Sequence, residues 1–463
     1  MSPPLPAFLT LHPLVVLVAS IALVIFLIGW CRLHAFFALL LGALAVALLS
    51  AGDKAPSALV DEVLAELGVL TGKIGYSIAI AAVIGAAMME SGAADRIVRT
   101  FLRVLGEKRA PWALLWSGFV LGVPVFFDTV FFLLIPLARA LTARTGKNYL
   151  LHVMAITAGG VITHATVPPT PGPLAMAEIL HVDLGLAMLA SLGLGVLPAV
   201  AGIAFARWHD RRHPVAMRAA AGSSLDAVAA AAAREESHLP GFGVSVAPVM
   251  IPVFLIAAVS IGAGWRESMP PALWSSLDFF GNKNVALTLG AVIAVAIYLR
   301  ESGGRWNATG HVVGEPLNTA GVIILITSAG GAYGAMIRNS GIGDVLRDWM
   351  SASGASPVFL AWGLSALLRA AQGSTTVAVI ATAGLMSSLG GGAGLGVPPL
   401  FLYVAIGYGG LFLSWMNDSG FWLYSRMGGL TEGETLRSWT VLLSLISVVG
   451  LLEALVLAAI FQS

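Results

Sequence analysis

Long apolar stretches alternate with short polar ones along almost the whole chain of 463 residues. A typical stretch, LVVLVASIALVIFLIGW at 14–30, holds no charged residue and approaches the ~20 residues of a bilayer-spanning helix. Ten such runs predict an all-α, polytopic membrane protein with about ten crossings. They lie at about 13–31, 35–50, 71–91, 149–180, 183–206, 244–265, 285–299, 316–337, 398–424 and 438–461.

Two further apolar segments, 111–142 and 357–388, are divided by a break into two short arms. Neither arm crosses a bilayer comfortably, and irregular backbone at membrane depth is tolerated only inside protein or beside a cavity. We therefore expect each segment to form a re-entrant hairpin.

Composition supports a membrane protein, because 58% of the residues are hydrophobic and only 11% are charged. A soluble chain carries about 25% charged residues. The net charge of +1 gives no indication of a nucleic-acid partner, and the lipid bilayer is the expected surroundings. With Cys31 as the single cysteine, neither a disulfide framework nor a cysteine metal site is expected, and no cofactor is predicted.

Positive residues predict the orientation of the chain. Clusters at 92–110 and 139–147 flank the first hairpin segment, and the arginines of 207–218 begin a polar linker at 207–243. Positive residues favour the cytoplasmic side. This places both ends of the first hairpin in the cytoplasm and, after ten crossings, both termini outside.

The chain also contains an internal repeat. The sequence GAAMMESGAADRIVRTF at 85–101 resembles GAMIRNSGIGDVLRDWM at 334–350, and Gly92 aligns with Gly341 at an offset of 249. The predicted orientation puts the first copy inside and the second outside. Such inverted-topology repeats are typical of secondary transporters. The predicted units are a first repeat at 1–206, the linker at 207–243, and a second repeat at 244–463.

Four helix breaks fall at equivalent places in the two repeats. They are PVFFDT (124–129), THATVPPTPGP (163–173), AQGSTT (371–376) and GYGGLFLSWMNDSGFW (407–422). The second and fourth interrupt the spans 149–180 and 398–424. Each break frees backbone N–H groups at a helix start, where the helix dipole attracts an anion. Paired interruptions of this kind indicate a transport site for a polar, anionic substrate.

The side chains at these breaks offer hydroxyls, an amide and a guanidinium for such a substrate. Capping of the helix ends is the alternative role for the Ser, Thr and Asn residues, and pairing with a buried aspartate is the alternative for the arginine. The candidate substrate-binding residues are Thr129, Thr166, Thr170, Gly373, Ser374, Thr375, Thr376, Asn417, Ser419 and Arg369.

Three ionisable residues at the breaks are candidates for carrying a coupling proton. They are Asp128, His164 and Asp418. Ionisable groups at membrane depth are costly, so their presence indicates function. Imidazole titrates near neutral pH, and burial in a medium of low dielectric favours the protonated form of a carboxylate. The sequence leaves open which of the three carries the proton, and His164 also fits a structural role at its break.

Four segments together resemble the gluconate:proton symporter (gluconate permease) family of the ion-transporter superfamily. They are FFDTVFFLLIPLA, THATVPPTPGPLA, LLRAAQGSTTVAVI, and MNDSGFW followed by ETLRSWT. The resemblance runs from about residue 71 to the C-terminus. It implies a bacterial inner-membrane symporter for a sugar acid or hydroxy acid. It also implies a homodimer whose transport domains move in an elevator-like way against a central scaffold.

One position departs from the family pattern H-x-x-V-P-P-H-P-G-P, because Thr170 stands where the second histidine is usual. This departure bears on which acid is carried, and the expected substrate class is still a small hydroxylated monocarboxylate. Sodium-coupled carboxylate transport and D-serine-type amino-acid transport are the alternatives within transport. An intramembrane metalloprotease is the alternative from another class, but the chain has no HExxH motif.

Overall fold

The computed structural model describes residues 12–51, 54–218, 239–303, 306–345, 348, 355–389 and 395–461. Every regular element in these ranges is a helix, which confirms the all-α prediction. Seven helical stretches there are long and apolar enough to cross a membrane. They are Pro56–Glu90, Tyr149–Leu180, Leu184–Arg212, Phe242–Ser268, Lys283–Glu301, Val312–Asn339 and Glu432–Phe461.

The helices follow the predicted apolar runs, with short additions between them. The first half contains α1 (Pro13–Gly29), α2 (Ala35–Leu49), α3 (Pro56–Glu90), α4 (Ala93–Leu105), α5 (Ala110–Leu121), α6 (Phe127–Thr145), α7 (Tyr149–Thr166), α8 (Pro171–Leu180), α9 (Leu184–Leu194) and α10 (Val196–Arg212). The second half contains α12 (Phe242–Gly262), α13 (Pro271–Gly281), α14 (Lys283–Glu301), α15 (Trp306–Asn339), α17 (Pro357–Gln372), α18 (Thr375–Ser388), α20 (Pro399–Gly409), α21 (Ser419–Gly428), α22 (Glu432–Thr435) and α23 (Val441–Phe461). Most of the predicted linker, 219–238, lies outside the described residues.

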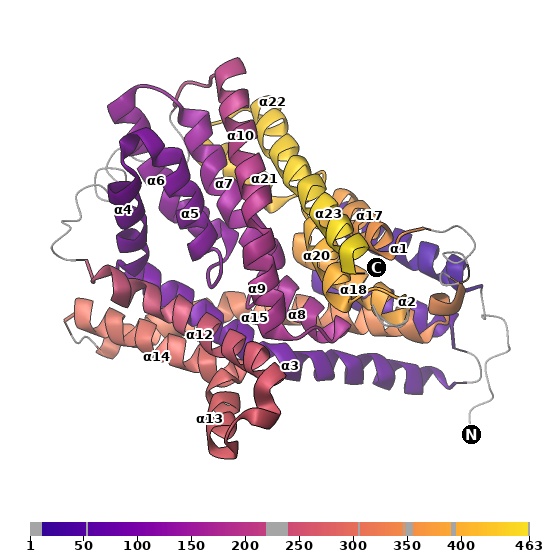
Figure 1. Cartoon of the computed structure of the whole chain (residues 1–463). Helices are drawn as coiled ribbons and strands as arrows, with labels where there is room; N and C mark the ends of the chain where they lie inside the picture. Colours follow the sequence, from indigo (N-terminus) through magenta and orange to yellow (C-terminus); the bar gives the residue numbers. More distant parts are fainter. Residues whose placement is uncertain are drawn as a thin grey trace.

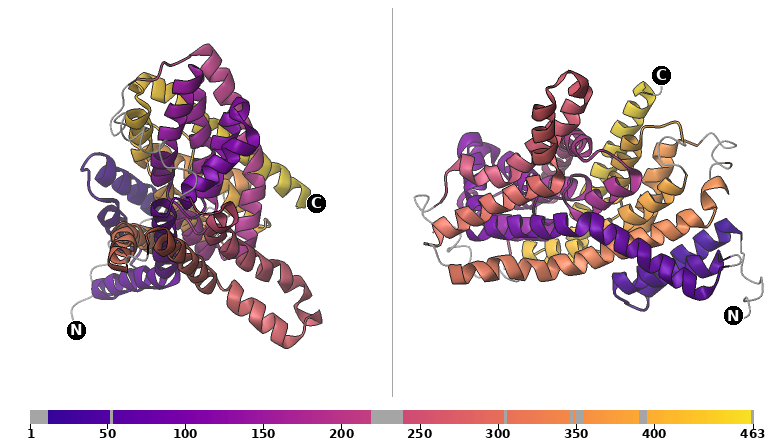
Figure 2. Two further views of the ribbon diagram at one scale, coloured as in Figure 1. Left: turned by 90° about the vertical axis from the view of Figure 1, so that its left-hand side faces the viewer. Right: turned by 90° about the horizontal axis from the view of Figure 1, so that it is seen from below.

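Two groups of helices differ in direction. In Figure 1, α10 and α23 run side by side through the upper part, whereas α3, α12 and α14 lie across the lower part, from which α13 projects. The long helices α3 and α15 pack along their length (Figure 2). They are antiparallel, because Thr71 bonds to Ser328 at 2.8 Å and Asn339 bonds to Glu62 at 2.9 Å.

Both long helices begin earlier than predicted. The expected runs were 71–91 and 316–337, whereas α3 begins at Pro56 and α15 at Trp306. The first four turns of α3 carry acidic residues, which lower the local hydropathy. Two of these acids bind residues at the end of α15: Glu62 accepts from Asn339 at 2.9 Å, and Glu66 lies 3.9 Å from Arg338. Glu62 also pairs with Lys54, just before α3. Tertiary packing thus extends the helix beyond its apolar run.

The two similar sequences end their helices in the same way. Helix α3 ends at Glu90 and α15 ends at Asn339, which are 249 residues apart. Each end is followed by a glycine with positive φ, +75° at Gly92 and +79° at Gly341. The second copy continues to 350, but residues 346, 347, 349 and 350 lie outside the described residues.

The four predicted breaks each separate two helices: α5 from α6, α7 from α8, α17 from α18, and α20 from α21. Close contacts between backbones hold these helices in place. A methyl group on Gly159 of α7 would lie 2.0 Å from the carbonyl oxygen of Leu115 in α5. One on Gly409 of α20 would lie 2.5 Å from that of Trp362 in α17. Small residues permit such approaches, and the close van der Waals packing that results helps to hold helices together in membranes.

Candidate functional site

The four breaks meet around one cavity of about 580 Å³. Each break contributes lining residues, and α15 closes one side. Eleven of the thirteen candidate residues line this cavity: Asp128, Thr129, His164, Arg369, Gly373, Ser374, Thr375, Thr376, Asn417, Asp418 and Ser419. Four segments that are distant in sequence therefore line one cavity.

Four helices begin at this cavity. The first residues of α8, α18 and α21 are Pro171, Thr375 and Ser419, and all three line it together with Phe127, the first residue of α6. The unpaired N–H groups and the dipole of a helix start attract negative charge. Helix α6 has no side-chain cap, whereas Ser374 and Asp418 cap α18 and α21. Helix α8 is also uncapped, but it begins Pro-Gly-Pro, so only Gly172 among its first three residues carries an N–H group. Helix α6 therefore offers the larger set of free donors to an anion.

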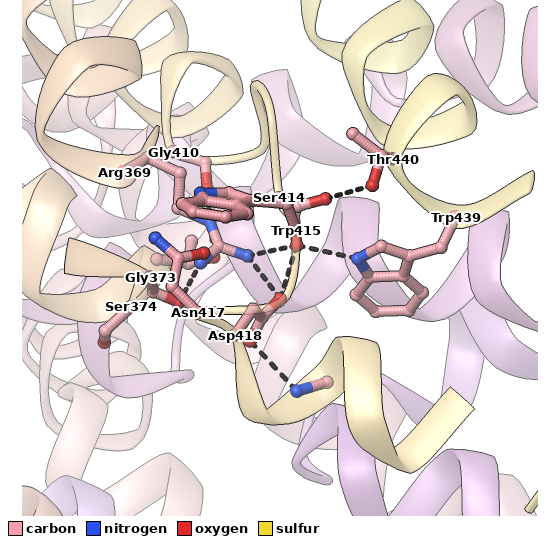
Figure 3. A network of polar contacts seen from close by, with 12 residues as sticks. Arg369, Gly373, Ser374, Gly410, Ser414, Trp415, Asn417, Asp418, Trp439 and Thr440 are labelled. Carbon is pink, nitrogen blue, oxygen red and sulfur yellow. Dashed lines mark hydrogen bonds and ion pairs between the residues drawn. The ribbon is translucent and has the colours of Figure 1, made fainter. Parts of the chain in front are cut away.

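Arg369 lies at the centre of a buried polar network (Figure 3). Its side chain is 2% exposed, and Nη2 donates to Oδ2 of Asp418 at 2.5 Å and to Oγ of Ser414 at 2.7 Å. Nη1 donates to the carbonyl oxygen of Gly373. Indole Nε1 of Trp439 donates to the same Ser414 oxygen at 2.7 Å. The network ties α17 to the break between α20 and α21.

Asp418 has its acceptors occupied. Oδ2 accepts from Arg369 and from Ser414 at 2.5 Å, and Oδ1 accepts from the backbone N–H of Gly420 at 2.9 Å. The geometry therefore supports the alternative role considered above for Arg369, a pair with a buried aspartate.

Asp128 and His164 are placed differently. Asp128 is in the first turn of α6, is exposed to the cavity, and has no hydrogen-bond or ion-pair partner among the described residues. His164, near the end of α7, is half-buried. Its Nδ1 is buried without a partner within the described part of the chain. Both groups are thus open to a ligand or a proton in a way that Asp418 is not.

The turn between α17 and α18 is fixed by its own side chains. Nε2 of Gln372 donates to the carbonyl of Ser374 at 2.6 Å, and its Oε1 accepts from the N–H of Ser374 at 3.1 Å. Oγ1 of Thr375 donates to the carbonyl of Gly410 at 2.9 Å. These bonds place the turn against the second interrupted span.

Thr166 and Thr170 do not line the cavity. Both are buried, and each hydroxyl donates to a nearby carbonyl, Thr166 to Ile162 at 2.8 Å and Thr170 to Val167 at 2.6 Å. These bonds stabilise the backbone around the break between α7 and α8. The departure from the family pattern at Thr170 therefore lies outside the cavity wall.

Several lining or supporting residues were not among the candidates. Gln372 and Trp439 line the cavity, Ser414 joins Arg369 to Trp439, and Thr319 comes from α15. Gln372 and Ser414 lie in the quoted breaks and could have been found there. Trp439 lies in the ETLRSWT segment and Thr319 within an apolar run, and neither position shows a helix break that would mark it as a cavity residue.

A second cavity of about 660 Å³ adjoins the first. The two share Phe126, Thr129 and Thr319 in their walls. Glu90 and Glu315 line the second cavity, at the end of α3 that precedes the arginine-rich helix α4. Phe126 thus stands between the candidate site and a space near the predicted cytoplasmic side.

Among the described residues, no group of three or more His, Cys, Asp or Glu is arranged to hold a metal ion. The polar groups at the cavity are hydroxyls, two amides, two carboxylates, an imidazole and the guanidinium of Arg369. This set suits a hydroxylated organic ion.

Comparison with known proteins identifies relatives over nearly the whole chain. The sequence profile described as GntP family permease matches residues 12–460. The chain is 32% identical to the Gnt-II system L-idonate transporter of Escherichia coli, over 97% of this chain and 100% of that protein. It is 32% identical to a gluconate permease of Pseudomonas aeruginosa, over 98% of each.

A solved structure has the same fold. The YdaH transporter of Alcanivorax borkumensis, whose structure is described as having an unusual topology, matches with a TM-score of 0.64. The match covers 92% of this chain and 98% of that one at 18% identity, so it supports the fold alone. The relatives are named permeases and transporters, which identifies a transporter rather than an enzyme.

Proposed function

The chain belongs to the GntP permease family, and we propose that it takes up gluconate or a related hydroxylated monocarboxylate together with a proton. Family membership and the apolar helices make it a multi-pass transporter of the bacterial inner membrane. The observation that carries the proposal is the convergence of four helix starts on one cavity lined by hydroxyls. Relatives named for gluconate and L-idonate support a sugar acid as the substrate.

In the proposed complex the substrate carboxylate meets the uncapped start of α6, near the N–H group of Thr129. A helix start stabilises an anion by about 0.3–1 kcal/mol when exposed and more when partly buried. The three other helix starts add to the same positive potential. Arg369 acts mainly through Asp418, since both of its Nη atoms are already bonded and only Nε is without a partner among the described residues.

The substrate hydroxyls meet other residues of the cavity wall. Thr376 and Ser419 present hydroxyls there, and Oδ1 of Asn417 is buried without a partner among the described residues. An unsatisfied buried acceptor costs about 1–3 kcal/mol. A sugar hydroxyl that donates to Asn417 would remove this cost, which favours a hydroxylated acid over a simple one.

We propose Asp128 as the proton carrier. It is the candidate carboxylate that faces the cavity without a partner, whereas Asp418 is held by Arg369, Ser414 and Gly420. Its place beside the proposed carboxylate site couples the two ligands. Protonation removes a negative charge that would repel the substrate, so each ligand favours the binding of the other. His164 is the remaining candidate.

The fold supports a proposed inverted repeat. Gly75 and Ile324 are separated by the repeat offset of 249, and a methyl group on Gly75 would lie 3.5 Å from Ile324. Equivalent positions touch where an axis of pseudo-symmetry passes between two antiparallel helices. The neighbours also correspond, since α5 packs on α7 as α17 packs on α20, and α14 packs on α3 as α2 packs on α15.

We propose that this repeat works as an elevator. The helices α1–α3 and α12–α15 form the scaffold, and the two hairpins with the interrupted spans form the moving unit. In a homodimer the two scaffolds would meet at the centre. The pairs α5–α6 and α17–α18 are then re-entrant hairpins whose turns, at 122–126 and 373–374, carry the substrate.

Transport by purified protein in proteoliposomes tests the proposal. Labelled gluconate should accumulate when an inward proton gradient is imposed, and unlabelled L-idonate should compete. A sodium gradient alone should give no accumulation. Accumulation that follows sodium and ignores pH would overturn the proton assignment, and competition by D-serine but not by sugar acids would overturn the substrate class.

A further inference from the structure

The end of α10 forms a basic groove that the transport proposal does not use. We propose that this groove binds the headgroup of an anionic phospholipid in the cytoplasmic leaflet. The groove has a volume of about 470 Å³ and is lined by Ala204, Arg207, Trp208, Arg211 and Arg212. This end of α10 stands at the top of the molecule in Figure 1.

Aromatic rings hold two of the guanidinium groups in place. The guanidinium carbon of Arg207 lies 5.3 Å from the centre of the Trp112 ring, and that of Arg212 lies 5.5 Å from Trp208. Stacking leaves the N–H edge of a guanidinium free for hydrogen bonds, and that edge matches the oxygens of a phosphate in a bidentate way. Trp208 itself is 50% exposed, as is usual for a tryptophan at a membrane interface.

The described residues provide no acidic side chain that pairs with the arginines of the groove, Arg207, Arg211 and Arg212. The nearest acid in sequence, Asp210, is buried and accepts from the backbone N–H of Leu151 at 3.2 Å. Within the described part of the chain, three adjacent positive charges are thus left available to an external anion.

The same face of α10 continues as an apolar strip. Leu197 is 52% exposed, and the exposed residues Val200 and Ala204 follow at helical spacing before Trp208 and Arg211. The opposite face packs on α7 and α23. Leu197 and Arg211 are 14 residues apart in a helix, or about 21 Å. One leaflet contributes about half of a hydrocarbon core of about 30 Å. A helix face of this length can therefore contact a headgroup at Arg211 and the acyl chains below it.

Orientation by positive residues does not by itself explain the groove. Lysine serves that purpose as well as arginine, and it requires neither aromatic stacking nor a concave site. Three features follow one another along α10: guanidinium groups without an acidic partner among the described residues, an exposed tryptophan, and an apolar strip. They match, in the same order, the phosphate, the interfacial region and the acyl chains of an anionic phospholipid. The proposal is independent of which substrate the protein carries.

Lipid selectivity in nanodiscs tests the proposal. The full-length protein is placed in phosphatidylcholine nanodiscs that contain brominated phosphatidylglycerol, and quenching by bromine is compared between wild type and Trp208→Phe to isolate the Trp208 signal. We expect Trp208 to be quenched more strongly than with the same fraction of brominated phosphatidylcholine. Each arginine removed should weaken the preference about fivefold, so Arg211→Ala/Arg212→Ala should lose most of it.

The pair Arg144→Ala/Lys147→Ala is the matched control, because both residues are exposed and predicted to be cytoplasmic but lie outside the groove. Thermal unfolding and gel filtration check that all variants fold. Arg211→Lys/Arg212→Lys should retain part of the preference, and free inorganic phosphate should not compete. Equal quenching by both lipids, an equal loss in the control pair, or cross-linking of Trp208→Cys to a second copy would overturn the proposal.

Discussion

Gly373 and Asn417 are in such close contact that a methyl group on Gly373 would lie 2.1 Å from the Asn417 carbonyl oxygen. The contact joins the turn between α17 and α18 to the break between α20 and α21. The φ of Gly373 is +87°, which is strained for any residue with a side chain. These two parts of the proposed substrate site therefore fit together only with glycine at 373.

Gly373→Ala should impair both stability and uptake. The added methyl group forces the two breaks apart, and the strained φ adds about 1–3 kcal/mol. We expect a lowered temperature of unfolding and at least a tenfold slower initial uptake rate. Gly363→Ala in α17 is the control, since a methyl group there meets nothing within 4 Å and should leave both unchanged or slightly improved. Wild-type uptake in Gly373→Ala would show that the contact is dispensable.

The pair of Arg369 and Asp418 should behave as a coupled structural unit. Removing one partner leaves a buried charge unpaired, which costs about 3–5 kcal/mol. Arg369→Met and Asp418→Leu should each lower the unfolding temperature strongly, and the double variant should recover much of the loss without recovering transport. Thermal unfolding of the wild type, the two single variants and the double variant completes a double-mutant cycle. Strictly additive losses would mean that the two side chains do not stabilise each other.

Asp128→Asn should uncouple transport from the proton gradient. The amide cannot take up a proton, so an inward proton gradient should no longer drive accumulation, while exchange of internal for external gluconate should continue. Asp128→Glu keeps the carboxyl group and should retain some accumulation. If Asp128→Asn accumulates gluconate like wild type, the proton is carried elsewhere, and the same assay on His164→Gln would then locate it.

Two cysteine cross-links should have opposite effects on transport. Glu178 of α8 and Lys283 of α14 form an ion pair between the proposed moving unit and the scaffold. Thr71 and Ser328 touch within the scaffold. In a Cys31→Ser background, which removes the single native cysteine, joining positions 178 and 283 should stop uptake, and joining 71 and 328 should not. Unchanged uptake by the first cross-linked protein would contradict movement between these parts.

The breaks could be predicted because they are encoded locally. Prolines and glycines such as Pro171 and Gly373 mark the ends of helices wherever they occur in an apolar run. The beginning of α3 could not, because its acidic turn is helical through contacts with α15, which lies more than 250 residues away. The local sequence pattern contains no information about such distant contacts.

The same distinction applies to the site. Polar residues at breaks were candidates by type, and eleven of them line the cavity, but sequence alone could not separate Asp128 from Asp418. That separation depends on Arg369, 49 residues before Asp418, and on Ser414. Thr166 and Thr170 differ from the other candidates because their hydroxyls bond to carbonyls within four residues.

The most direct test of proton-coupled sugar-acid uptake follows both ligands in the same proteoliposomes, without an imposed gradient. A pH-sensitive dye inside reports protons, and labelled gluconate reports substrate. Adding gluconate outside should acidify the interior in step with gluconate entry, and Asp128→Asn should abolish the acidification. Entry of gluconate into wild-type liposomes with no change in internal pH would contradict proton-coupled uptake.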